Sequence, residues 1–429
     1  MKKKLMATAV TLITTIFTSS VGIWGAERTI DVSDDVTVYM DGEELELTDE
    51  QGNSVDAFIY NGTTYLPARA VTEANGNTVS WDGEDDRVDL NISTRTTQTD
   101  DPTRAQLVSE DEKGYTFELS DNVTRTHVTY DNRYGIEIAA DLYTPVDLDE
   151  SQKYPAIVIG PPYGGVKEQG PGVYANQLAQ RGFVVLAFDP SYNGESGGSE
   201  RHASSPDVFT EDFSAGVDYL GLLDYVDRDR IGAIGICGSG GFALSAAQVD
   251  TRIKAVATAS MYDISRATRN GFGDTMTDEA RDELLEQLGE QRWEDAENGY
   301  PEYIPSWPAE PTETVPEGMD AITEEFYTYY ATERGFNPRA CANFTTTSQI
   351  PFVNYSLLDH LNDISPRPVL LIIGENAHSR YFSEDVYEEI TGPKELYVVP
   401  DANHIDLYDD TSKIPFDKLE SFFNDAFES

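Results

Sequence analysis

Residues 229–241 read DRIGAIGICGSGG, and this stretch decides the fold. Its first half is apolar enough for a strand buried in a sheet, and its glycine-rich half is a tight turn into a helix over residues 242–248. Such a turn strains the backbone at one residue and lifts that side chain above the sheet, so the residues two before and two after it must be small. Gly235 and Ser239 meet this condition around Cys237, which the turn would present as a nucleophile.

The same stretch allows a second register. Cys237 and Gly241 are the small residues around Ser239, which makes Ser239 the alternative nucleophile. The helix that follows would direct its positive N-terminus at the turn, which favours a thiolate at Cys237.

Continuous apolar runs recur on both sides of this turn, at 156–159, 183–188, 255–259 and 369–373. Such runs are typical of strands buried on both faces of a parallel sheet, and helical patterns separate them. We therefore expect an α/β fold with a doubly wound, mostly parallel sheet. One interval is too long for a plain connection, and we interpret it as a helical cap insertion over about residues 262–350. Aromatic residues that could line a cleft under this cap are Trp293, Tyr303, Trp307, Tyr327 and Tyr330.

The N-terminus predicts export. Lysines at positions 2–4 precede an apolar run to Phe17, and small residues lead to Ala26, which is the pattern of a secretory signal peptide over residues 1–26. We expect a secreted or cell-surface protein. The net charge of −47 argues against nucleic acid as a partner, and Cys237 and Cys341 are too few for a disulfide framework.

Residues 33–93 form a small β-rich unit of their own, with hairpin signals at Asp41-Gly42 and Asn61-Gly62. The strings YNGTTYLPARAV at 60–71 and VSWDG at 79–83 resemble the copper-amine-oxidase-like N-terminal domain, also called the stalk domain. No histidine precedes His127, so nothing here would hold copper. We expect this domain to act in spacing or in cell-envelope attachment, and residues 94–120 to be a linker.

The stretches at 160–169, 188–198, 374–382 and 404–408 resemble the dienelactone hydrolase-like α/β hydrolases, in the same order along residues 121–429. The resemblance implies an α/β-hydrolase fold, no cofactor, and cleavage of a small-molecule ester, lactone or thioester bond. In hydrolases that read Arg-Ile-Gly-x-x-Gly-x-Ser the nucleophile falls seven residues after the arginine, which favours Cys237 over Ser239.

The family order of nucleophile, acid and base places the base late in the chain. His404 follows the strand predicted over residues 396–399 and is the expected base, with His378 the next choice. Many hydrolases carry the acid three residues after the position of Gly374, where this chain has Ala377. The candidate acids are, in order of preference, Glu375, Asp263 and Asp406.

An oxyanion hole needs two backbone N–H groups. Gly238 follows the nucleophile, and Tyr163 is the expected second donor because Pro161 and Pro162 have no N–H. Glu168 could approach the thiol, as a carboxylate does in dienelactone hydrolase, and no metal site is expected. Two other readings stay open: a prolyl-oligopeptidase-like peptidase, and a non-catalytic envelope-associated binding protein, which Ala377 favours.

Overall fold

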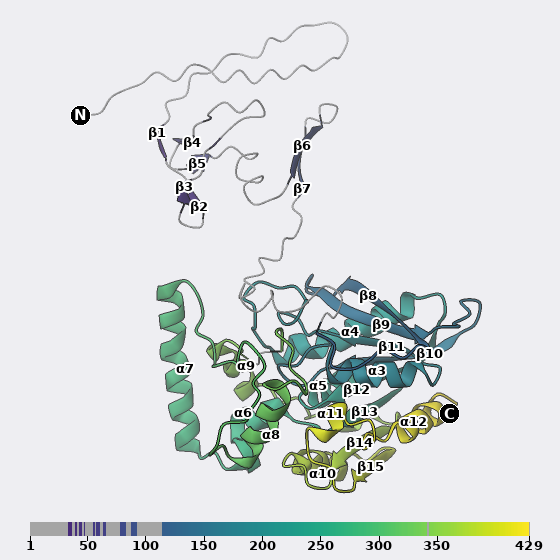
Figure 1. Cartoon of the computed structure of the whole chain (residues 1–429). Coiled ribbons are helices and arrows are strands. Elements are labelled where there is room, and N and C mark those ends of the chain that lie inside the picture. The colour runs from purple at the N-terminus through teal and green to yellow at the C-terminus, as the bar shows by residue number, and fades with distance from the viewer. Residues whose placement is uncertain are drawn as a thin grey trace, which may run out of the picture. The chain divides into compact units, whose positions relative to one another are not determined.

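The computed structural model describes residues 114–340 and 343–428, preceded by the short strands β1–β7 and the single positions Leu47 and Val55. The chain divides into two compact units, residues 1–95 and 96–429 (Figure 1). The predicted signal peptide, Cys341 and most of the predicted linker lie outside the described residues.

The described part of the first unit consists of short antiparallel strands. β4 (Ala57–Tyr60) lies between β1 (Ser33–Val36) and β5 (Thr63–Tyr65), while β2 (Tyr39–Met40) pairs with β3 (Glu43–Glu44) and β6 (Thr78–Asp82) pairs with β7 (Arg87–Asn91). The β4–β5 register joins Tyr60 to Thr63 and leaves only Asn61-Gly62 between the strands, as the turn chemistry predicts. The β-rich prediction is therefore confirmed for the described strands.

The second unit is built on one eight-stranded mixed sheet in the order β15-β14-β13-β12-β10-β11-β9-β8. The strands from β15 to β11 are parallel, and β9 and β8 run antiparallel at one edge. Their bounds are β8 (Val123–Asp131), β9 (Glu137–Pro145), β10 (Tyr154–Gly160), β11 (Val184–Phe188), β12 (Val226–Ile236), β13 (Ala255–Ala259), β14 (Val369–Gly374) and β15 (Lys394–Val399).

Helices cover both faces of this sheet (Figure 1). One face carries α3 (Gly170–Ala179) and α12 (Phe416–Glu428); the other carries α4 (Pro206–Leu222), α5 (Ser239–Val249) and α10 (Arg380–Glu389). In β10, Ile157 and Ile159 pack into the first layer and Ala156 and Val158 into the second, all fully buried. A strand covered on both faces needs apolar residues at every position, which confirms the doubly wound α/β prediction.

The interval between β13 and β14 is the helical insertion. It contains α6 (Ile264–Asn270), α7 (Asp278–Asn298), α8 (Ala321–Tyr330) and α9 (Gln349–Asn354). The Thr277 hydroxyl caps the start of α7, and Gly299 ends it with a φ of 77°. Leu288 is the one buried residue of α7, which stands at the side of the domain in Figure 1. Trp293 on this helix is 66% exposed, so it does not line an enclosed cleft.

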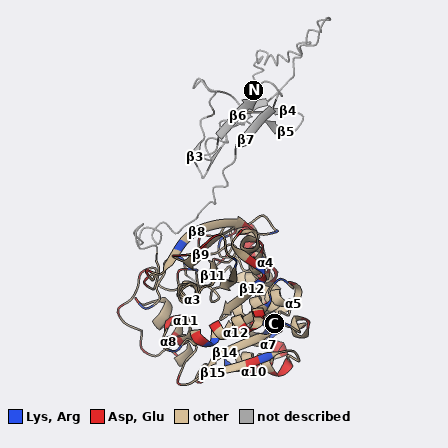
Figure 2. Ribbon diagram, turned by 90° about the vertical axis from the view of Figure 1, so that its right-hand side faces the viewer, with Lys and Arg blue, Asp and Glu red and all other residues tan. Residues whose placement is uncertain are grey.

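Acidic residues lie on several helices rather than in one patch (Figure 2). In the part of the chain that the structure describes, no helix is long and apolar enough to cross a membrane.

The sheet reverses its order at β10, which has β11 on one side and β12 on the other. Ligand sites of open α/β sheets form at the carboxyl ends of strands at such a point. The β10–β12 pairing ends with Gly160 opposite Gly235, so the loop after β10 and the turn after β12 leave the sheet side by side. The fold thereby brings together the Tyr163 loop and the Cys237 turn.

Candidate active site

Cys237 occupies the turn between β12 and α5 with a φ of 54°. This value lies in the left-handed region, which is unfavourable for residues other than glycine. The Cys237 N–H donates to the Ala259 carbonyl and the Cys237 carbonyl accepts from the Tyr262 N–H, each at 2.9 Å. A Cβ at Gly235 would lie 2.1 Å from the Ser239 carbonyl oxygen, so only glycine fits two residues before Cys237.

Ser239, the alternative nucleophile, is the first residue of α5 and is not among the residues with positive φ. A Cβ on Gly160 would lie 2.7 Å from the Ser239 Oγ and 2.5 Å from the Phe213 ring. The Ser239 hydroxyl is therefore packed against the end of β10. The backbone strain typical of the raised residue in such a turn falls on Cys237 instead.

Burial raises the pKa of the Cys237 thiol above its ordinary value. Hydrogen bonds from the Tyr408 hydroxyl and from the backbone N–H groups of Tyr163 and Gly238 lower that pKa, but burial is the larger effect. The thiol is therefore neutral at rest and needs a base, contrary to the thiolate expected from the helix N-terminus. The structure does bring both predicted oxyanion donors, Tyr163 and Gly238, to the sulfur.

Side chains hold the Tyr163 loop in place. The Tyr163 hydroxyl lies 2.6 Å from the Ser204 Oγ, and its ring stacks on Phe344 with the ring centroids 4.0 Å apart. At the end of the loop, the Lys167 N–H donates to the Asp189 carboxylate at 2.8 Å. These contacts keep the Tyr163 N–H directed at the nucleophile turn.

Lys167 is fully buried, and its ammonium forms ion pairs with Glu168, Asp189 and Glu195. In the described residues, these three carboxylates are the group close enough together to hold a metal ion. Because the ammonium already lies among them, the cluster is a charge-paired anchor rather than an open metal site. Glu168 also pairs with Arg339 at 2.6 Å, so its carboxylate belongs to this network and not to the thiol.

His404, the expected base, is fully buried in the loop between β15 and α11 (Asp406–Asp409). Its Nδ1 lies 2.6 Å from the Ser379 Oγ and its Nε2 lies 2.9 Å from the Tyr408 hydroxyl. Burial, with the nearby His378, holds the pKa of His404 well below its usual range. The imidazole is therefore neutral and able to accept a proton.

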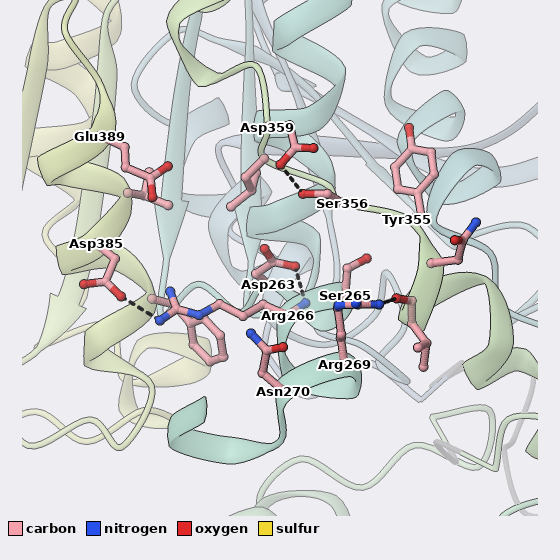
Figure 3. Close-up of a pocket in the computed structure, with 15 residues that line it drawn as sticks. Asp263, Ser265, Arg266, Arg269, Asn270, Tyr355, Ser356, Asp359, Asp385 and Glu389 are labelled. Atoms are coloured by element: carbon pink, nitrogen blue, oxygen red, sulfur yellow. Dashed lines mark hydrogen bonds and ion pairs between the residues drawn. The ribbon is translucent and has the colours of Figure 1, made fainter. Parts of the chain in front are cut away.

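The structure brings none of the proposed acids to His404. Glu375 is exposed and accepts a hydrogen bond from the Asp401 N–H at 3.1 Å. Asp263 caps α6 by accepting from the Arg266 N–H at 2.9 Å, in a cleft that α6 and α10 line (Figure 3). Asp406 pairs with Lys413 at 2.6 Å. The geometry gives no support to Glu375 or Asp263 as the acid, since each carboxylate is engaged elsewhere.

Two residues that the sequence did not single out occupy the surroundings of the imidazole instead. Ser379 takes the position at Nδ1 where a carboxylate was expected. The Glu325 carboxylate of α8 contacts the loop that carries His404. It accepts from the Ile405 N–H at 2.7 Å and lies 3.5 Å from the His378 Nδ1. The His378 ring in turn lies 4.6 Å from the His404 ring. Glu325 therefore contacts the loop that carries His404, through the Ile405 N–H, and not the imidazole itself.

Comparison with known proteins gives a consistent picture. The dienelactone hydrolase family matches residues 138–270, and the copper amine oxidase N-terminal domain matches residues 26–115. The uncharacterized protein PA2218 of Pseudomonas aeruginosa is 51% identical over 326 residues, which cover 75% of this chain and 86% of that protein. Its crystal structure superposes with a TM-score of 0.70 at 50% identity, over 74% of this chain and 98% of the other.

More distant relatives have names that state an activity. The α/β hydrolase GrgF from Penicillium superposes with a TM-score of 0.59 at 20% identity, over 71% of this chain and all (100%) of that one. The thiohydrolase aneE of Aspergillus aculeatus is 26% identical over 280 residues, 63% of this chain and 83% of that protein. With the elbow, the two oxyanion donors and the buried histidine in one site, the chain belongs to the dienelactone hydrolase family and is an α/β hydrolase that acts on ester bonds.

Proposed function

We propose that the chain is a secreted or cell-surface hydrolase that cleaves a small-molecule ester, lactone or thioester, with Cys237 as nucleophile and His404 as base. One observation carries this proposal. Cys237 has the left-handed backbone of a raised nucleophile, and the Tyr163 and Gly238 N–H groups reach its sulfur. The same donors would bind the oxyanion that forms when the sulfur attacks a carbonyl carbon.

In the proposed reaction, the thiol loses its proton to His404 as the sulfur attacks. The tetrahedral intermediate collapses to an acyl-Cys237 thioester when the alcohol or thiol leaves with that proton. Water then attacks the thioester with His404 as general base and releases the acid. Burial keeps the His404 imidazole neutral, which is the form needed at both steps. The name of the thiohydrolase relative supports thioesters as one substrate class.

The test is turnover of p-nitrophenyl acetate and of acetylthiocholine by the wild type, Cys237→Ala and Ser239→Ala. We expect Cys237→Ala to lose more than about 1000-fold in kcat/KM on both substrates, and Ser239→Ala to lose less than about tenfold. Intact-mass analysis of quenched reactions should show an acetyl group that maps to Cys237. The opposite pattern would move the nucleophile to Ser239, and no turnover by the wild type would favour a binding protein.

Residues 1–26 and the N-terminal domain support the proposed location. The signal-peptide pattern predicts that the mature chain begins after Ala26 and lies outside the cytoplasm. N-terminal sequencing of the protein from culture medium and from washed cell envelopes tests both points. A chain that keeps Met1 and stays in the cytoplasm would contradict the proposal.

A further inference from the structure

Tyr408 contacts the base of the proposed site. It belongs to α11, four residues after His404, and is fully buried. Its hydroxyl lies 2.9 Å from the His404 Nε2 and interacts electrostatically with the Cys237 thiol. The other ring nitrogen of His404 is engaged by Ser379. Both nitrogens of the base therefore contact hydroxyl groups: Nδ1 contacts Ser379 and Nε2 contacts Tyr408.

We infer that Tyr408 carries the proton between Cys237 and His404. This inference rests on the proposed function, since it assigns the path by which the proposed nucleophile is activated. Tyr408 is then a catalytic residue, because its hydroxyl contacts the base directly and passes it the proton of the thiol.

The step balances without any further reactant. His404 starts neutral, with its proton on Nδ1 toward Ser379, and the Tyr408 O–H donates to Nε2. The thiol S–H donates to the Tyr408 oxygen. As the sulfur bonds to the carbonyl carbon, the thiol proton passes to the Tyr408 oxygen and the original Tyr408 proton passes to Nε2. The tyrosine is regenerated, the imidazole becomes an imidazolium, and the reverse transfer protonates the leaving group.

The surroundings of Tyr408 favour this coupled transfer over separate ionisation of the tyrosine or of the thiol. Burial raises the pKa of Tyr408 well above its ordinary value, and Cys237, Tyr330 and Tyr262 add to the shift. A tyrosinate or a free thiolate would therefore be costly in this site, whereas a coupled transfer forms neither. His378, with Glu325 beyond it, and Tyr262 are the other titratable groups that face the imidazole.

The hydroxyl is held by contacts that do not involve the reaction. The Tyr174 hydroxyl of α3 donates to the Leu407 carbonyl at 2.7 Å, which ties α11 to α3. The Tyr329 ring packs edge-on against the Tyr408 ring with the centroids 5.3 Å apart. The Tyr329 hydroxyl has no hydrogen-bond partner among the described residues, which makes Tyr329→Phe a matched control.

The experiment measures alkylation of Cys237 by iodoacetamide, mapped by peptide mass, from pH ~5 to ~10. It compares the full-length wild type, Tyr408→Phe, Tyr329→Phe and His404→Ala. In the wild type and in Tyr329→Phe, we expect a rate that is constant across neutral pH and depends on His404. In Tyr408→Phe, we expect about a 100-fold loss at neutral pH and a tenfold rise per pH unit into the alkaline range, because the thiol must then ionise unaided.

Equal profiles for Tyr408→Phe and the wild type would show that the tyrosine only fills space. Faster labelling would show that it separates the thiol from the base; either result overturns the inference. A measurement on the wild type alone covers the case in which the variant does not fold. The labelling rate in mixtures of H₂O and D₂O should curve with the deuterium fraction, because two protons move, and a straight line would overturn the inference. Alkylation of Cys237 can be measured without any ester turnover. If the proposed function is wrong, Cys237→Ala will still hydrolyse esters, and this result is separate from the labelling rates that test Tyr408.

Discussion

Two buried polar clusters flank the loop that carries Tyr163, and they are built on opposite principles. Around Lys167, every charge has a partner: the ammonium pairs with Glu168, Asp189 and Glu195. Around His404, the reactive groups are held uncharged: burial raises the pKa of Cys237 and lowers that of His404. Charge pairing of this kind suits an anchor, and burial raises the pKa of Glu168 within it. Neutral groups joined by hydroxyls suit a site that creates charge only during reaction.

The largest effect should come from removing the base. His404→Ala should lower kcat/KM for p-nitrophenyl acetate by about 1000-fold, because the neutral thiol then has no proton acceptor. The folded state should remain, since the paired Lys167 cluster is untouched, and circular dichroism with thermal unfolding checks this. If His404→Ala lost its folded structure together with its rate, His404 would be needed for folding as well, and the two clusters would not differ in the way described.

A substitution in the Lys167 cluster should lower the stability of the fold. Lys167→Met leaves buried carboxylates without their cation, and we expect the free energy of unfolding to fall by about 3–5 kcal/mol in urea titrations. Lys418→Met is the matched control, because Lys418 pairs with a half-exposed Glu395 and its loss should cost under about 1 kcal/mol. Equal effects of the two substitutions would show that the Lys167 cluster is not an anchor.

Ser379→Ala tests whether a hydroxyl can replace the missing carboxylate. It removes the 2.6 Å contact at the His404 Nδ1, and we expect kcat to fall about tenfold because the ring loses its orientation. Ser383→Ala is the control: Ser383 is buried on α10, and its hydroxyl has no hydrogen-bond partner among the described residues. A full-rate Ser379→Ala enzyme would mean that another group orients the imidazole.

The smallest effects concern pH. The pKa of His404 is lowered in the folded state, so the acid limb of the kcat/KM profile should lie well below pH ~6.5, the ordinary histidine value. The unfolded chain binds a proton at His404 at pH values where the folded chain does not. This contribution therefore destabilises the fold as the pH falls from ~6.5 toward the folded-state pKa, and it vanishes above that range. His404→Gln should flatten this part of the stability curve, and an acid limb at or above pH ~6.5 would contradict the assignment.

Much of the turn that carries Cys237 can be predicted from the spacing of residues close together in the sequence. The glycine at position 235 and the order of strand, turn and helix place Cys237, and the two prolines before Tyr163 leave that residue as the donor. These inferences succeed because backbone geometry over a few residues imposes them. The surroundings of His404 can be predicted only in part. His404 follows from chain order, but its partners Ser379 and Tyr408 are ordinary polar residues until the fold sets them against the ring.

The sequence by itself determined the sheet class, the raised position of Cys237 and the place of His404, because periodicity and steric limits act along the chain. Tertiary structure alone decided which groups face the imidazole and whether the thiol is charged. Glu375 was predicted to be the acid because it follows Gly374, yet its carboxylate accepts from the Asp401 N–H. The carboxylate that contacts the loop of His404 is Glu325, which comes from α8 in the cap insertion. Hydrogen bonds between distant segments and the burial of ionisable groups depend on three-dimensional packing, which local sequence does not specify.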